Sequence, residues 1–438
     1  MGELMGKHAK PDILTIEVGS TLTKLIAFGA GRILARAISL TTPADVMAGV
    51  ERAMSELAAE HGIDLADAGA VFATSSAAGG LRMTVHGLTR DLTTMAAEEA
   101  ALGAGANVKL ITAGPLTERD ERVLRQIAPN LIMLAGGVEY GAEDIVLANA
   151  KRIAALALPA PVVYAGNVTL REEVQRVFEQ AAGELIVVEN VYPRFDELNV
   201  GPVRAVIQRL FAERLTIAPG TDRLRELCKG EILPVPGACL RAAELLADRI
   251  GDLVVVDVGG ATTDVHSVID TPSAGNVDPQ IRARRTVEGD LGLFVSAQSV
   301  WEKLGRQGQP DPLNALPLTD AERAVSAALA GKAAELALLR HAGRTVPGAV
   351  LPGGKQAVRG RDLRSAKTIV GTGGGLAGLP GGLDRLREAL RDQRRDTLMP
   401  PPHVAVHTDR DYVFSACGAF CGSHPDAAFS LMRQSLGI

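Results

Sequence analysis

The sequence predicts an α/β protein made of two related halves, with an added run of alternating strands and helices. Three observations support this fold class. Apolar strands at residues 13–18 and 253–258 each run into a turn of glycine and threonine, and a second apolar strand follows each turn. A third glycine cluster follows a largely apolar stretch at residues 366–370. Between the hairpins, residues 107–193 alternate short apolar strands with amphipathic helices, which is typical of a parallel sheet.

The hairpin near the middle of the chain has the composition of a phosphate-binding turn. It reads Asp-Val-Gly-Gly-Ala-Thr-Thr-Asp from Asp257 to Asp264. Glycines let the backbone approach an anion, so that N–H groups can point at phosphate oxygens. Threonines add hydroxyl donors, and carboxylates suit the oxygen shell of Mg²⁺, with Asp257 expected to act through water. The residues expected to bind phosphate here are Gly259, Gly260, Thr262 and Thr263.

The N-terminal hairpin repeats this layout. It reads Glu-Val-Gly-Ser-Thr-Leu-Thr-Lys from Glu17 to Lys24, and Lys24 supplies a cation for a phosphate. Two copies in one chain predict a duplicated fold that holds one phosphate tail from both sides. The third cluster, at residues 371–375, suits a flat surface for a purine and ribose. The further expected ligand residues are Gly19, Ser20, Thr21, Thr23 and Lys24, with Gly373, Gly374 and Gly375 for the nucleoside.

These three segments resemble, in the same order, the signature of the actin and sugar-kinase ATPase superfamily. Other segments, at residues 73–82, 134–138, 257–268 and 285–292, are similar to the glutamate mutase accessory proteins called MutL or GlmL. The resemblance extends over nearly the whole chain.

The resemblance implies a two-lobed actin-like ATPase fold, built from duplicated RNase H-like domains with an additional parallel βα subdomain in the first half. The first lobe is expected at residues 11–250 and contains the subdomain at about 107–193. The second lobe is expected at residues 251–438, with the adenosine motif and the C-terminal helices. The subdomain exceeds what such a lobe needs, so it is a candidate for binding something other than ATP.

Composition limits the other classes of function. The chain has 438 residues, a formal net charge of −5 and no markedly basic segment, so the sequence offers no basis for nucleic-acid binding. Its apolar runs are interrupted well short of a membrane span. The first ten residues lack the apolar region of a signal peptide. We therefore expect a cytoplasmic protein with no membrane partner.

Four cysteines in a chain of this length do not make a disulfide framework. Cys417 and Cys421, followed by His424, fit either part of a metal site or a buried helix. No fourth ligand is evident, and small and apolar residues lie around both cysteines, which favours the buried helix.

The resemblance also implies roles in phosphoryl chemistry. Asp257 and Glu17 are the expected metal-binding carboxylates, and with Asp290 they are the expected catalytic residues. The first motif of the superfamily more often begins with aspartate, so Glu17 leaves open either a slow ATPase or nucleotide binding with negligible turnover. Asp290, ahead of Glu288, fits the group that positions the attacking water. The alternative is that this segment is only a turn into a helix.

Three functions fit these residues, with ATP and Mg²⁺ as the implied cofactors. The resemblance implies an ATP-dependent reactivating chaperone for an adenosylcobalamin-dependent mutase of the glutamate mutase type. In this hypothesis the mutase subunits are the partners, and lobe movement releases damaged cobalamin. The alternatives are a small-molecule kinase of the same superfamily and a non-hydrolysing, nucleotide-dependent scaffold. No base for a kinase acceptor stands out, and Glu17 motivates the scaffold.

Overall fold

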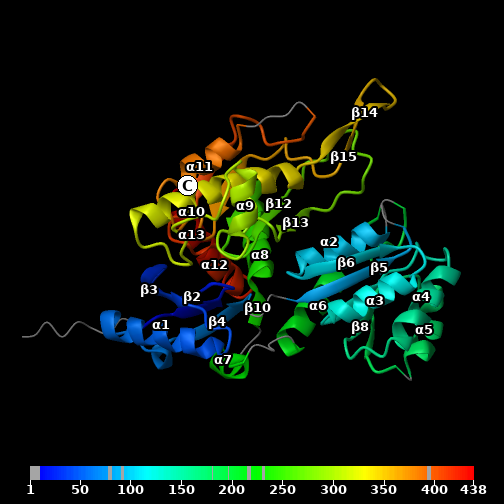
Figure 1. Ribbon diagram of the computed structural model, residues 1–438, viewed down its shortest axis with the longest axis horizontal. Coiled ribbons are helices and arrows are strands. Elements are labelled where there is room, and N and C mark those ends of the chain that lie inside the picture. Colours follow the sequence, from blue (N-terminus) through cyan, green and yellow to red (C-terminus); the bar gives the residue numbers. More distant parts are fainter. Residues whose placement is uncertain are drawn as a thin grey trace, which may run out of the picture.

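The computed structural model describes residues 10–76, 81–89, 93–179, 181–195, 197–214, 219–228, 232–391 and 396–438. These residues form three five-stranded sheets and one two-stranded sheet. Figure 1 shows the first lobe in blue, the βα subdomain in cyan and green beside it, and the second lobe in yellow to red above both. Within the described ranges, no helix is both long enough and apolar enough to cross a membrane.

The first sheet is built around the N-terminal hairpin. Its strands are β1 (Ile13–Val18), β2 (Leu22–Gly29), β3 (Arg32–Leu40), β4 (Ala70–Ser75) and β10 (Ile232–Pro234). Their order is β10-β4-β1-β2-β3, with β1 antiparallel to β2 and parallel to β4. Helices α1 (Val46–His61) and α7 (Thr221–Cys228) pack against this sheet. The Asp45 side chain caps α1 by accepting the Met47 N–H, which explains why the helix begins there.

The second sheet repeats the first. Its strands are β11 (Leu253–Val258), β12 (Thr263–Val268), β13 (Ala283–Glu288), β16 (Thr368–Thr372) and β17 (Ala405–Thr408). The order β13-β12-β11-β16-β17 has the same pattern, with an antiparallel hairpin and a parallel neighbour on its other side. This repetition confirms the predicted duplication of an RNase H-like lobe. The remaining elements of this lobe are α9 (Ala297–Lys303), α10 (Asp320–His341), α11 (Gly382–Ala389), β14 (Arg344–Val350) and β15 (Gln356–Arg359).

Two helices cross between the lobes. Helix α8 (Val235–Ile250) follows the last strand of the first sheet and packs against β12 of the second. Helix α12 (Phe414–Phe420) follows the last strand of the second sheet and packs against β1 and β4 of the first. Figure 1 shows the two helices side by side between the lobes. One apolar cluster joins residues of both sheets to α8, α12 and the C-terminal helix α13 (Pro425–Leu436), including Cys417 and Cys421.

The third sheet forms the βα subdomain. Its strands are β5 (Arg82–Gly87), β6 (Asn107–Ala113), β7 (Leu131–Leu134), β8 (Val162–Tyr164) and β9 (Leu185–Val187). All are parallel, in the order β6-β5-β7-β8-β9. The covering helices are α2 (Met95–Gly103), α3 (Glu118–Ile127), α4 (Asp144–Ala155), α5 (Arg171–Phe178) and α6 (Val200–Arg214).

The four strands expected between residues 107 and 193 are confirmed, but the sheet also contains β5, which the sequence analysis missed. This strand carries Thr84 and His86 in its buried interior. His86 bonds Thr84 over 3.0 Å and Thr112 over 2.7 Å, so its polar groups are satisfied inside the sheet. The polar residues interrupt the apolar run that would otherwise reveal a central strand.

Candidate functional site

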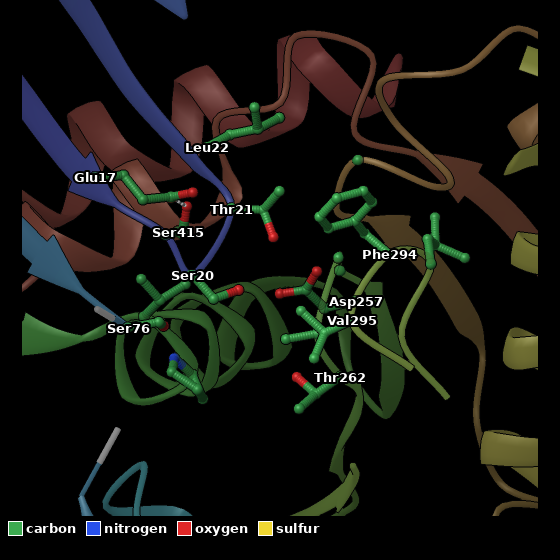
Figure 2. A pocket seen from close by; sticks show the side chains of 18 of the residues that line it. Glu17, Ser20, Thr21, Leu22, Ser76, Asp257, Thr262, Phe294, Val295 and Ser415 are labelled. Atoms are coloured by element: carbon green, nitrogen blue, oxygen red, sulfur yellow. Dashed lines mark hydrogen bonds between the residues drawn. The ribbon is translucent and has the colours of Figure 1, made fainter. Parts of the chain in front are cut away.

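A cavity of about 510 Å³ lies between the two lobes, and both glycine-rich turns line it. Figure 2 shows Ser20 and Thr21 of the first turn on one side, with Asp257 and Thr262 of the second lobe across from them. The predicted site residues that line the cavity are Glu17, Gly19, Ser20, Thr21, Asp257, Gly259, Gly260, Thr262 and Gly374.

The two turns share one backbone geometry. In the first, the Gly19 N–H donates to the Leu22 carbonyl over 2.9 Å, and in the second the Gly259 N–H donates to the Thr262 carbonyl over 2.9 Å. A Cβ at position 19 would lie only 2.6 Å from the Leu22 oxygen, so this tight turn requires glycine. The repetition of the hydrogen bond shows that the sequence similarity between the hairpins reflects an equivalent local structure.

The tips of the two turns meet across the lobes. A Cβ built on Gly260 would lie 2.4 Å from the Thr21 hydroxyl oxygen, so any other residue here would push the Thr21 side chain out of its present position. The Thr21 hydroxyl oxygen is buried and has no hydrogen-bond partner within the described part of the chain. A polar atom of this kind favours a ligand at the contact.

Asp257 lies at the end of β11 and faces the cavity. Burial of its carboxyl group, together with the nearby Asp264 and Glu17 carboxylates, raises the pKa of Asp257 to about 7. The Cys239 thiol donates a hydrogen bond to the Asp257 Oδ2 atom over 3.7 Å. A buried carboxylate among other carboxylates is stabilised by a cation beside it. Among the residues that the structure describes, no group of three or more His, Cys, Asp or Glu side chains is placed to hold a metal by itself, so Mg²⁺ at Asp257 would need water and phosphate oxygens as its other ligands.

Glu17, at the equivalent place on β1, has its own partners. Its carboxylate pairs with Lys24 over 3.3 Å and accepts a hydrogen bond from the Ser415 hydroxyl. Ser415 lies on α12, which comes from the second lobe, whereas Cys239 lies on α8, which comes from the first. Each strand-end carboxylate is therefore bonded by the helix that crosses over from the other lobe. Sequence reasoning missed both residues; their shared place near the start of each crossing helix is the signal that identifies them.

Lys24 does not line the cavity that the described residues form, although the sequence predicts that it faces the phosphates. Its ammonium group lies 3.4 Å from the centre of the Tyr412 ring and donates to the Tyr412 carbonyl over 3.0 Å. Only 3% of the side chain is exposed. Register explains this position, because Lys24 is the cross-strand partner of Glu17 and lies on the same face of the sheet.

Thr23 and Thr263 also lie below the turns rather than in the cavity lining. Thr23 shares a hydrogen bond of 2.9 Å with the Thr41 hydroxyl, and Thr263 donates to the Leu291 carbonyl over 2.6 Å. Both residues are fully buried. In this structure they therefore brace the turns, which differs from their expected contact with phosphate.

Asp290 does not line the cavity formed by the described residues. It accepts hydrogen bonds from Arg340 over 2.7 and 3.0 Å and pairs with Lys303 over 3.1 Å. The hydrogen bonds from Arg340, with Lys303 beside them, lower the pKa of Asp290 to about 2. These two basic side chains hold the Asp290 carboxylate outside the cavity lining, and its expected role in positioning the attacking water stays a prediction.

Replacing Asp290 with asparagine should therefore change nucleotide hydrolysis by no more than about twofold, because the change alters a half-exposed ion pair of small energetic weight. Steady-state phosphate release beside the unmodified protein measures this. If the rate of hydrolysis instead falls as much as expected for a carboxylate that lines the cavity, Asp290 acts in the site.

The glycine cluster after β16 serves two purposes. Gly374 lines the cavity, whereas Gly373 and Gly375 pack beneath it. Gly373 has φ of 82°, and a Cβ there would lie 2.3 Å from the Asp257 Oδ1 atom. Gly375 donates its N–H to the Val258 carbonyl over 3.0 Å. The third cluster therefore supports the carboxylate of the second hairpin as well as the cavity surface.

Substituting Gly373 with alanine should lower the free energy of unfolding by about 2–3 kcal/mol, because the new Cβ combines left-handed backbone strain with collisions at the Asp257 carboxylate and at the backbone of Val258. Gly374→Ala is the matched control, since its Cβ would have no atom within 4 Å and its φ is ordinary. Urea unfolding of both variants measures the difference. Equal stability of the two would show that the backbone around Gly373 and Val258 shifts at little cost, which would contradict the tight packing inferred for this cluster.

Several cavity residues were not anticipated. Arg285, on β13, lines the cavity and is 3% exposed. Phe294 and Val295 stand at its mouth, 42% and 70% exposed, and both donate their N–H groups to the Gly260 carbonyl. Figure 2 shows both side chains beside the second turn. Their place depends on the loop after β13 folding back onto the hairpin, which no local pattern indicates.

Two lobes of one topology, with paired glycine turns over a shared cavity and two crossing helices, define a protein of the actin-like ATPase fold. The chain belongs to the MutL protein family, which matches residues 13–436. It is 35% identical over 456 aligned positions to Protein MutL of Clostridium tetanomorphum, covering 97% of this chain and 98% of that protein.

Solved structures with a similar arrangement have low sequence identity to this chain. A glycerol dehydratase reactivase is 12% identical with a TM-score of 0.37, over 95% of this chain and 100% of that one. The ligand-bound xylulose kinase of Lactobacillus acidophilus is 12% identical with a TM-score of 0.33, over 97% of this chain and 91% of that one.

Proposed function

We propose that the protein is an ATP-dependent reactivating chaperone for an adenosylcobalamin-dependent mutase of the glutamate mutase type. Membership of the MutL family supports the mutase as partner. The observation that carries the ATP-dependent part is the meeting of two equivalent glycine turns, one from each lobe, over a single cavity. A phosphate chain at this contact would be held from both sides.

The proposed nucleotide site uses the residues that line the cavity. Backbone N–H groups around Ser20 and Gly260, with the Thr21 and Thr262 hydroxyls, would hold phosphate oxygens. Gly374 would face the nucleoside. Asp257 would hold Mg²⁺, which supplies charge neutralisation to the phosphates when bound. Glu17 lines the same cavity, but Lys24 already balances much of its charge.

The crossing helices suggest how nucleotide binding would produce movement. A ligand that contacts both turns favours the arrangement in which the lobes are close, and its loss removes that preference. The strand-end carboxylates bond α8 and α12, so a change at the cavity would be transmitted to the helices that join the lobes. Movement of one lobe against the other would then separate mutase subunits and let damaged cobalamin leave.

Magnesium-dependent ATP hydrolysis by the purified protein tests this proposal. The measurement is made alone, with active glutamate mutase, and with mutase inactivated by bound damaged cobalamin, beside the Asp257→Asn variant. Slow hydrolysis alone, acceleration by the inactive mutase and loss of turnover in the variant are expected. Turnover that requires a small metabolite would instead indicate a kinase.

A non-hydrolysing nucleotide-dependent scaffold is the second candidate, and the environment of Glu17 favours it. The carboxylate is committed to Lys24 and Ser415, which leaves it less able to hold a metal or orient water. Tight ATP binding without phosphate release, with and without the inactive mutase, would support this candidate. Gain of hydrolysis in a Glu17→Asp variant would attribute the missing turnover to this residue.

A further inference from the structure

A line of hydrogen bonds runs from the second glycine turn to the βα subdomain. The Thr262 hydroxyl donates to Asp264 Oδ2 over 2.9 Å. Asp264 Oδ1 accepts from the Arg285 guanidinium, with Nε at 2.7 Å and Nη2 at 2.5 Å. Arg285 Nη1 then donates to the carbonyls of Leu102 and Ala106, over 3.0 and 3.1 Å. The line therefore ends on the carboxyl-terminal end of α2.

The middle of this line is buried. Asp264 is 5% exposed and Arg285 is 3% exposed, so their charges are balanced mainly by each other and by the groups just named. The carbonyls at the end of a helix carry partial negative charge and favour a cation there. Arg285 thus divides its donors between a carboxylate of the second lobe and a helix end of the subdomain.

We infer that Arg285 is a positioning residue that couples ligand binding at the second glycine turn to the docking of the βα subdomain on the second lobe. The inference rests on the proposed nucleotide site. The Thr262 hydroxyl has one proton, so donating it to a phosphate oxygen withdraws it from Asp264. Arg285 must then balance more of the negative charge of the Asp264 carboxylate. Arg285 also lines the cavity, where a bound phosphate would attract its guanidinium group.

Both effects draw Arg285 away from α2 and weaken the docking of this helix end. The subdomain would thereby be loosened when nucleotide binds, without any contact between nucleotide and α2. The subdomain already lends Asn107 and Lys109 to the cavity lining, and this coupling would add a change in the docking of α2 that depends on the nucleotide. The element whose docking changes is α2, which packs on β13.

Arg284 provides a matched control next in sequence. It pairs with Glu99 of the same helix over 2.7 Å, and the Glu99 side chain is 6% exposed. Arg284 therefore contacts α2 through Glu99, whereas Arg285 contacts both the end of α2 and Asp264. Loss of Arg284 should loosen α2 but leave its response to nucleotide intact.

Hydrogen exchange in α2, residues 95–103, tests the coupling, because none of these residues lines the cavity. It is measured with and without saturating Mg²⁺ and a non-hydrolysable ATP analogue. Calorimetry measures binding of the same analogue. In the unmodified protein we expect exchange to become about 3- to 10-fold faster on binding. Arg285→Met should show fast exchange that no longer responds, Arg285→Lys a reduced response, and Arg284→Met a full response from a raised baseline.

Thr262→Val removes the hydroxyl group at the start of this series of hydrogen bonds and leaves Arg285 in place. It therefore tests the same coupling if Arg285→Met does not fold. We expect no response of α2 at saturating analogue in this variant. An unchanged α2 in the unmodified protein despite measured binding would overturn the coupling alone, as would a full response in Arg285→Met or Thr262→Val. Absence of binding to the unmodified protein would overturn the proposed nucleotide site and the coupling with it.

Discussion

Replacing Asp257 with asparagine should lower Mg²⁺-dependent ATP hydrolysis by about 100-fold or more. Asparagine keeps the size of the side chain but removes the negative charge that the proposed metal requires. The remaining cavity residues keep their backbone donors, so binding of ATP without Mg²⁺ should change much less. Phosphate release and calorimetry with and without Mg²⁺ separate the two effects. Retained hydrolysis would remove Asp257 from the proposed site.

The same substitution should stabilise the nucleotide-free protein at high pH. The folded-state pKa of Asp257, about 7, lies above that of an aspartate in an unfolded chain, about 4. The stability that the neutral carboxyl contributes is complete below pH 4 and is lost as pH rises through 7. Asp257→Asn escapes this loss, because its side chain stays neutral.

At pH 8 we expect Asp257→Asn to be more stable than the unmodified protein by about 1–3 kcal/mol, less than the full shift implies because the residue keeps some contact with solvent. The difference should vanish below pH 4, and added Mg²⁺ should reduce it by stabilising the charged form. Thermal unfolding across this pH range provides the measurement. A variant that is less stable at every pH would show that the Asp257 charge is already compensated.

Removal of Lys24 should produce the largest loss of stability of any single change considered. Lys24→Met keeps the length of the side chain but leaves the Glu17 carboxylate, whose side chain is 9% exposed, without its ammonium partner. Breaking a buried ion pair from one side costs about 3–5 kcal/mol. The methionine also loses the cation–π attraction to the Tyr412 ring and the hydrogen bond to the Tyr412 carbonyl.

The double variant Lys24→Met/Glu17→Gln separates the charge from the packing. Glutamine keeps a polar group for the Ser415 hydroxyl but carries no charge, so the double variant should regain most of the stability that Lys24→Met loses. Urea unfolding of the single and double variants measures this recovery. If the double variant is as unstable as Lys24→Met alone, the contacts of Lys24 with Tyr412 dominate and the ion pair contributes little.

Much of the fold followed from local patterns. Both hairpins were predicted because each puts apolar strands on either side of a glycine turn, and the turns at Gly19 and Gly259 have the same hydrogen bond. The four strands from residue 107 onward were predicted from the alternation of apolar strands with amphipathic helices. Strand β5 was missed because Thr84 and His86 interrupt its run of apolar residues. Their burial is tolerated because the two side chains hydrogen-bond to each other inside the sheet.

The site residues within the glycine turns were predicted from the sequence. The site residues whose positions depend on partners far away in the sequence were not. Asp257 and the glycines come from single segments, so their proximity to the cavity follows from the hairpins. Asp290 was assigned to the site from its motif, but Arg340, 50 residues further along, holds it elsewhere. Arg285 gave no signal, because its partners Leu102 and Ala106 lie in another part of the chain.

The two equivalent hairpins with phosphate-type turns follow from the amino-acid sequence alone, because strand alternation and glycine turns are encoded within about fifteen residues. The tertiary structure alone decided which charges face the cavity. Ser415 reaches Glu17 across 398 positions, and Cys239 reaches Asp257 only because α8 crosses to the other lobe. Such contacts arise from the packing of whole lobes and helices against one another, and that packing leaves no periodic trace in any one segment.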